Sequence, residues 1–227
     1  MAARTVGAII AETAILLDDE QMVRFKPYML RTWLNEAQRE VSKITECLRA
    51  KTTIAVTADT QSYAMTANVV RVVEIYFYSA TDTQRYPLEY RDHRASRPIW
   101  GTSRSLSQGC PVMYWTEGYP GAFTLGLFPI PSQDGTLEVH YNRFSTDFVT
   151  NLGTDDASSI DLPIGWEGTC VSWMLMRAFQ ASRETERANG ARAEFDANVG
   201  MLIEASVRYV DEPGSITMDS WYDIFGD

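Results

Sequence analysis

The sequence predicts an α+β protein in which about four helices, contributed by both ends of the chain, form a bundle around an inserted antiparallel β-sandwich or open barrel. Near both ends, apolar residues recur at steps of three and four, as in amphipathic helices. The middle of the chain is rich in β-branched and aromatic residues that alternate like strands. Neither helical half alone can enclose a core, so we expect the two halves to pack together.

Residues 1–50 are predicted to hold the first two helices. The first covers Thr5–Leu17 and ends in the acidic run 18–20, which suits a solvated loop. The second begins near Pro27, a residue that is favourable in a first helical turn. Its apolar stripe comprises Leu30, Trp33, Leu34, Ala37, Val41 and Ile44, and its opposite, polar face comprises Asn35, Glu36, Gln38, Arg39, Glu40 and Lys43.

Residues 51–145 are predicted to form the β-rich insertion. Its first strands are Thr52–Val56 and Val69–Tyr78, and the second is apolar on both faces except at Arg71 and Glu74, which favours a central position. A long loop with a short helical turn is expected over 91–111. The strands Val112–Thr116 and Ala122–Phe128 flank a five-residue hairpin loop. In the last strand, Thr136–Phe144, alternation points Leu137, Val139 and Tyr141 inward and Thr136, Glu138, His140 and Asn142 outward.

Residues 146–210 are predicted to return to the bundle. After a polar loop, a helix should begin at Asp161–Pro163 and run to about Arg183, with Asn189-Gly190 as the break before a last helix. The predicted bundle core therefore draws on three of the four helices. Its residues are Leu30, Trp33, Leu34, Ala37, Val41, Val171, Met174, Leu175, Phe195 and Leu202.

Residues 211–227 are predicted to be an extended acidic and aromatic tail. The segment has five acidic residues, no basic residue and no periodic face. Its apolar cluster near the end consists of Trp221, Tyr222, Ile224 and Phe225, which have no core to enter. We expect them to act as an anchor that inserts into a neighbouring protein surface.

The chain is acidic, with a formal charge of −10 over 227 residues. Sequence-independent DNA binding needs clustered Lys and Arg, so the composition argues against it, although not against a protein that surrounds DNA without holding it. No apolar run approaches the roughly 20 residues of a membrane-spanning helix, and no signal peptide is expected. Cys47, Cys110 and Cys170 are predicted to be free thiols in a reducing compartment.

Nothing in the sequence predicts catalysis. Its two histidines, His93 and His140, have no neighbouring Cys or second His that could complete a metal site, and the common nucleophile, phosphate-loop and zinc motifs are absent. Asp155, Asp156 and Asp161 lack the spacing of a calcium loop. We predict a protein that is not an enzyme and needs no cofactor or metal.

The aromatic residues of the insertion leave a second interpretation open. Trp100, Tyr114, Trp115 and Tyr119 could form a platform on which a sugar stacks, as in a carbohydrate-binding module. Core packing and hairpin formation would produce the same set of aromatic residues.

Several local patterns, in this order, resemble head-to-tail adaptor (connector) proteins of tailed bacteriophages over residues 5–209. The first are a short helix led by Thr5-Val6 and the helix 30–41, which reads LRTWLNEAQREV. The others are Gln61-Ser62-Tyr63, Pro111–Tyr114, Phe128–Pro131, Leu137–Tyr141 and Asp161–Pro163. The sequence departs from the family at Tyr63-Ala64-Met65, where an apolar residue followed by Pro is expected.

The resemblance implies a structural protein of the virion, located at the head–tail junction and assembled in the host cytoplasm. Such proteins form a homo-oligomeric ring, commonly dodecameric, under the portal protein. The ring extends the DNA channel and provides the platform for tail tube, nozzle or tail-fibre proteins, while genomic DNA passes without specific binding and no membrane is involved. A stopper or tail-completion protein of the same particle is the alternative, and positions facing the channel should be acidic or neutral.

Overall fold

The computed structural model describes residues 4–80, 84–92, 108–147 and 156–211, and it divides the chain into two compact units. Residues 48–144 form one unit, called the β unit here. Residues 1–47 and 145–227 form the other, the helical unit. Four described helices and several largely antiparallel sheets confirm the predicted α+β class.

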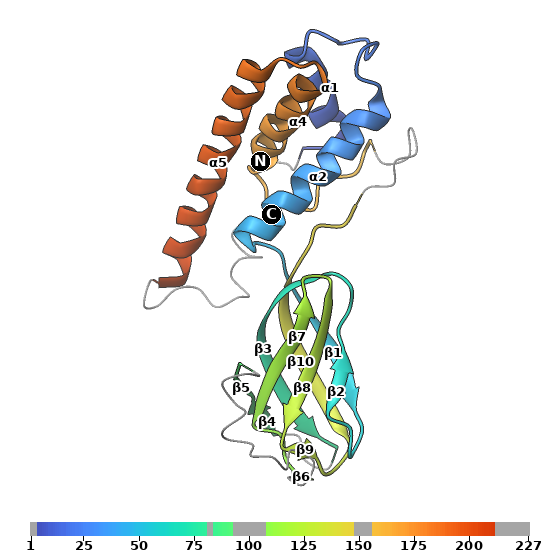
Figure 1. Ribbon diagram of the computed structural model, residues 1–227, viewed down its shortest axis with the longest axis vertical. Coiled ribbons are helices and arrows are strands. Elements are labelled where there is room, and N and C mark those ends of the chain that lie inside the picture. The colour runs from blue at the N-terminus through green and yellow to red at the C-terminus, as the bar shows by residue number, and fades with distance from the viewer. Residues whose placement is uncertain (1–3, 81–83, 93–107, 148–155, 212–227) are drawn as a thin grey trace. The chain divides into compact units, whose positions relative to one another are not determined.

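The β unit consists of two four-stranded sheets and one short two-stranded sheet (Figure 1). The first large sheet has the order β1-β10-β3-β4 and the second β2-β8-β7-β5, while β6 pairs with β9. β3 therefore lies inside its sheet. The strands are β1 (Arg49–Val56), β2 (Ser62–Ala64), β3 (Val69–Ser79), β4 (Arg85–Pro87), β5 (Glu89–Tyr90), β6 (Gln108–Gly109), β7 (Met113–Tyr119), β8 (Ala122–Phe128), β9 (Ile130–Pro131) and β10 (Gly135–Arg143).

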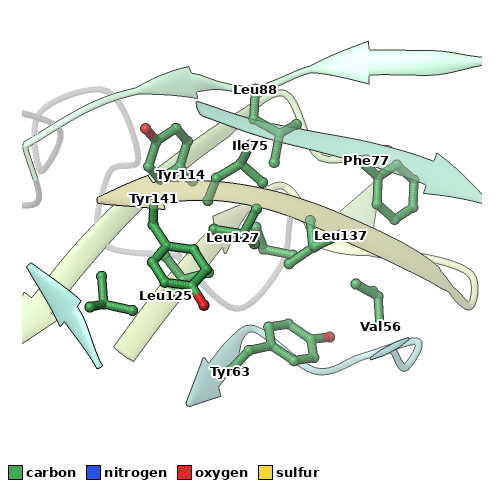
Figure 2. Packing of buried hydrophobic residues seen from close by; sticks show 12 residues of the cluster. Val56, Tyr63, Ile75, Phe77, Leu88, Tyr114, Leu125, Leu127, Leu137 and Tyr141 are labelled. Carbon is green, nitrogen blue, oxygen red and sulfur yellow. The ribbon is translucent and has the colours of Figure 1, made fainter. Parts of the chain in front are cut away.

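The core of the β unit lies between the two large sheets, as Figure 2 shows. Ile75, Phe77 and Leu137 from one sheet pack with Leu125 and Leu127 from the other. The sheets do not close on themselves, so the arrangement is a sandwich and not a barrel. Alternating apolar residues on both inner faces are what such a sandwich requires.

Two details of the β unit correct the expectations from the sequence. β7 and β8 pair as far as Tyr119 and Ala122, so the hairpin loop holds two residues and not five. Gly121, with φ +88°, permits this tight turn. Asn142, expected to face outward, is buried, because register irregularities on both sides of Tyr141 and Asn142 interrupt the alternation at the end of β10.

The helical unit contains α1 (Val6–Leu16), α2 (Pro27–Thr45), α4 (Glu167–Ala181) and α5 (Thr185–Asp211). α4 packs against each of the other three, and Figure 1 shows α4 and α5 side by side. Of the predicted core residues, eight are buried, and Leu175 and Leu202 are partly exposed. The two halves of the chain therefore meet on α4.

The predicted starts of the last two helices are wrong. α4 begins at Glu167 and not at Asp161, because Gly165 adopts φ +95° and the Trp166 amide closes a turn onto the Pro163 carbonyl (3.2 Å). The break before α5 lies at Arg183, whose φ is +62°. Asn189-Gly190 lies inside α5, where an exposed glycine costs the helix only about 1 kcal/mol relative to alanine.

Candidate interaction surface

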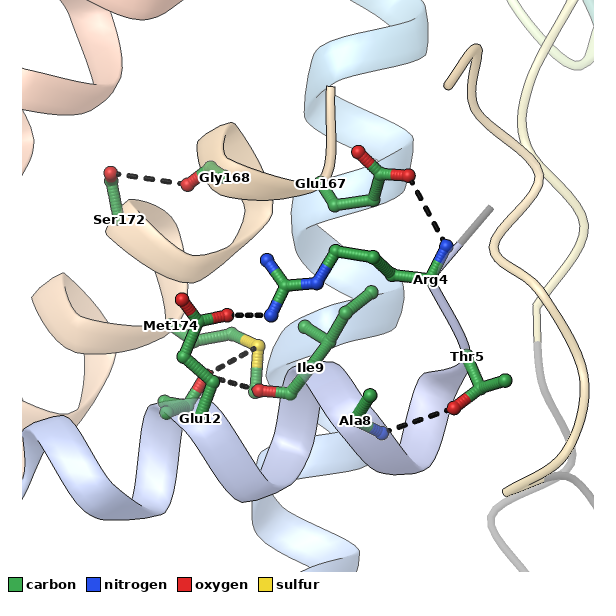
Figure 3. A network of polar contacts seen from close by, with 10 residues as sticks. Arg4, Thr5, Ala8, Ile9, Glu12, Glu167, Gly168, Ser172 and Met174 are labelled. Carbon is green, nitrogen blue, oxygen red and sulfur yellow. Dashed lines mark hydrogen bonds and ion pairs between the residues drawn. The ribbon is translucent and has the colours of Figure 1, made fainter. Parts of the chain in front are cut away.

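A polar network fastens the start of α1 to α4 (Figure 3). The Arg4 backbone amide donates to the Glu167 carboxylate at 3.4 Å, and the Arg4 side chain pairs with Glu12. Thr5 caps α1 by accepting a hydrogen bond from the Ala8 amide at 3.2 Å. The contact between Arg4 and Glu167 joins chain segments that are 163 residues apart.

A buried polar stripe on α2 holds the segment that returns from the β unit. Gln38, expected on the solvent face, is fully buried, and its side-chain oxygen accepts a hydrogen bond from the Asp161 amide (2.9 Å). The Ser42 hydroxyl accepts one from the Ser145 amide (3.2 Å), and buried Arg31 pairs with Asp156. Asn35 is buried as well, so two of the six residues of the predicted polar face are internal. Amphipathic spacing cannot separate polar residues that face water from those that bind another segment.

The loop between α1 and α2 is an ordered structure that carries apolar side chains on its surface. The Asp19 carboxylate accepts hydrogen bonds from the amides of Val23, Arg24 and Phe25 at 2.7–3.3 Å. These bonds, led by the one from Phe25 and aided by the charge of Lys26, lower the pKa of Asp19. The large apolar side chains exposed in and around this loop are Ile15, Leu16, Val23 and Tyr28, which together we call the loop patch.

The loop patch was missed in the sequence analysis, although the sequence contains a signal for it. α1 reads VGAIIAETAIL and has apolar residues on nearly every side, which a partly exposed helix does not need. Ile15 is 60% exposed and Val23 69% exposed. Exposed apolar groups held by an ordered loop are typical of a contact surface.

The β unit offers a second surface along β1. This strand has eight residues and pairs only with β10 among the described residues, so one of its edges is open. Arg49, Lys51, Thr53 and Ala55 alternate as its exposed positions. An open strand edge presents amide and carbonyl groups to any chain that can pair with it.

A polar cluster covers part of the outer face of the β1-β10-β3-β4 sheet. Glu138 lies 2.7 Å from both His140 and Arg85, and hydrogen bonding to His140 is the main cause that lowers the pKa of Glu138. The Arg85 guanidinium stacks on the Tyr76 ring at 3.5 Å. Within the part of the chain that the structure describes, no three His, Cys, Asp or Glu residues gather as metal ligands.

The alternative sugar platform is not formed by the residues that the structure describes. Tyr114 and Trp115 are buried, and burial raises the pKa of Tyr114 to about 12. Tyr119 is 71% exposed, and Trp100 lies outside the described residues, as does His93. Trp115 packs on Gly126, where an added Cβ would lie 2.0 Å from its ring. These two aromatic residues belong to the core.

The predicted tail anchor of Trp221, Tyr222, Ile224 and Phe225 lies outside the described residues. Cys47, Cys110 and Cys170 are free cysteines. No helix among the described residues has both the length and the apolar character that crossing a bilayer requires. What the described residues provide is therefore two surfaces suited to binding protein, one on each unit.

Comparison with known proteins identifies one family. The model of the SU10 adaptor protein family matches residues 4–217, which includes both units and the first six residues after α5. No curated protein matches the chain. The match covers nearly the whole chain, and the chain therefore belongs to the SU10 adaptor protein family, whose members are structural phage proteins that associate with other virion proteins and not enzymes.

Proposed function

We propose that the chain is a head-to-tail adaptor that forms a dodecameric ring under the portal, extends the DNA channel and provides the platform for the tail. The observation that carries this proposal is the family match over residues 4–217. The helical unit would build the ring wall, and the ring would bind the portal on one side and tail tube, nozzle or tail-fibre proteins on the other.

The two open surfaces support a ring. In a closed ring, each subunit contacts its neighbours through two different, complementary surfaces. The loop patch and the β1 edge differ in chemistry, since one is apolar and the other exposes backbone groups beside basic side chains.

The tail is the third element of the proposal. Trp221, Tyr222, Ile224 and Phe225 would anchor a copy to the portal or to a neighbouring adaptor, as large apolar side chains do at the centre of interfaces. The charge of −10 in each copy favours a channel wall that repels phosphate, so that DNA passes without being retained.

The test is the oligomeric state of the full-length chain with and without its portal, measured by native mass spectrometry and electron microscopy. We expect a ring that binds the portal directly. A ring that binds only below another adaptor would identify a stopper or tail-completion protein. A chain that stays monomeric in the presence of portal would contradict the proposal.

Two variants separate the contributions of the tail. Deleting residues 215–227 should weaken portal attachment or ring formation, and replacing Trp221, Tyr222, Ile224 and Phe225 with serine should have nearly the same effect. The matched control replaces only Glu212 with glutamine and Asp227 with asparagine and retains every apolar residue. Unchanged assembly in the serine variant would eliminate the anchor role.

A further inference from the structure

Among the edge strands of the two large sheets, β1 is the one that is neither short nor interrupted in the described structure. The other three edges are β4 and β2, with three residues each, and β5, with two. β1 has eight residues, no proline, and a regular register with β10 from Arg49 to Val56. Proteins usually shorten or bend such an edge because it invites pairing with another chain. A long, regular edge is therefore expected to have a partner.

The side chains of β1 indicate the charge of that partner. Arg49 and Lys51 are exposed on the same face of the strand, two residues apart. No ion pair joins either of them to another described residue. β1 has no acidic residue. Arg49 and Lys51, beside the open backbone groups of β1, therefore favour the binding of an acidic strand.

A segment of this chain has those properties. Residues 215–225 read SITMDSWYDIF, eleven residues without glycine, proline or a basic group. Isoleucine, threonine and aromatic residues favour strands. Asp219 and Asp223 supply the opposite charge. Pro213-Gly214 immediately precedes the segment and separates it from α5.

We propose that residues 215–225 of one copy add as a strand to the open edge of β1 in a neighbouring copy. Backbone hydrogen bonds would provide the affinity, and pairing of Asp219 and Asp223 with Lys51 and Arg49 would help to set the register. The inference rests on the proposed ring and names the surface that receives the tail. Each copy donates one strand and offers one edge, so the contact repeats around a closed ring.

The loop patch is the competing docking surface, and its charge argues against it. Val23 and Tyr28 are accompanied by Lys26 and Arg24, but Asp18, Asp19 and Glu20 precede them in the same loop. Arg24 is already paired with Glu184 at 3.3 Å. An acidic segment would meet like charges there, which disfavours binding. On β1 it would meet none from the strand itself.

The lysine content of the chain allows a direct test. The chain has only three lysines, Lys26, Lys43 and Lys51, and they lie beside the loop patch, on α2 and on β1 respectively. A carbodiimide links a lysine amine to a carboxylate only when the two are in contact. We treat the assembled full-length protein with carbodiimide and map the links by mass spectrometry, using mixed isotope-labelled and unlabelled copies to separate links between copies from links within one.

We expect Asp219 or Asp223 to link to Lys51 between copies. A link from these residues to Lys26 or Lys43, a link to the portal alone, or a Lys51 link confined to one copy would overturn the proposal.

Charge reversal provides a second test, in which the share of chain in rings is measured. K51E should reduce the share of chain in rings by several-fold, and combining it with D219K should restore assembly, whereas the matched control K43E should change little.

Hydrogen exchange tests the backbone pairing itself. On assembly, the amides of residues 49–56 that point away from β10 should exchange roughly tenfold more slowly. T217P removes an amide donor within the added strand and should abolish this protection, while G214P, just before the strand, should preserve it. Equal protection in T217P would overturn the proposal.

A wild-type chain that forms no ring contradicts the proposed function, whereas a ring with the tail bound elsewhere contradicts only this inference.

Discussion

The β unit and the helical unit are held together in different ways. The β unit is one continuous stretch of chain around an apolar core, whereas the helical unit is assembled from two stretches separated by the insertion. Nine of the eleven buried polar side chains described lie in the helical unit. Apolar burial is strong but non-directional, so distant segments that must find one register depend on directional polar contacts.

Truncation of the two cores tests this difference most strongly. F195A, which removes the ring that packs on Trp173 at 4.9 Å between centroids, should destabilise the helical unit by about 3–5 kcal/mol. L127A should destabilise the β unit by about 2–5 kcal/mol. Residue-resolved hydrogen exchange should find each loss confined to one unit. Loss of protection in both units from either variant would show that the units unfold together.

Crowding the sandwich tests how closely the β unit is packed. G126A places a methyl group 2.0 Å from the buried Trp115 ring, so the ring or the strand must shift. Overpacking of this kind costs about 1–3 kcal/mol. Chemical denaturation followed by tryptophan fluorescence measures it, with G190A on exposed α5 as the control that should be neutral or stabilising.

Removing one ion pair tests the polar attachment of the helical unit. D156N leaves the shape at this position nearly unchanged but removes the charge that faces Arg31, which is 2% exposed. Because Asp156 is half exposed, we expect a loss of about 1–2 kcal/mol, below that of a fully buried pair. D147N, which breaks the exposed pair with Arg39, is the matched control and should cost under about 1 kcal/mol. Equal effects would contradict a special role for the α2 stripe.

Acid should weaken the helical unit through the α1–α2 loop. The folded state lowers the pKa of Asp19 from its ordinary 3.8, so the stabilisation is fully present above that pH and is lost as the pH falls through the lower, folded value. Denaturation midpoints of the helical unit measured down to about pH 2 should therefore decline less steeply in D19N than in the wild type. The β unit serves as the internal control, and an unchanged slope in D19N would count against the loop.

The elements that sequence reasoning predicted well are those with one dominant face. α2 begins at Pro27 as expected, and β10 alternates as expected through Leu137, Val139 and Tyr141. The fold class follows from these patterns. They fail where a local geometry overrides the period, as at Asn142, where the register shifts, and at Gly165, where the chain turns before α4.

The candidate surfaces were harder to predict for a different reason. Gln38 and Lys51 are both polar residues in periodic segments, yet the first is fully buried and the second is exposed on an open edge. This difference in burial depends on contacts with segments about 100 residues away in the sequence, at Asp161 for Gln38 and in β10 for Lys51. Such contacts are set by the topology of the fold. No local pattern in the sequence contains it.

The two ends of the β unit suggest how such a protein can change over evolution. The strand that enters the unit and the strand that leaves it are neighbours, since Arg49 pairs with Asn142 and the Arg143 amide donates to the Leu48 carbonyl at 2.8 Å. Adjacent strands lie about 5 Å apart. The β unit can therefore be inserted wherever two points of the helical chain lie about that far apart. Any compact module with adjacent ends could replace it, and a lineage could exchange its docking module while its helical scaffold stays the same.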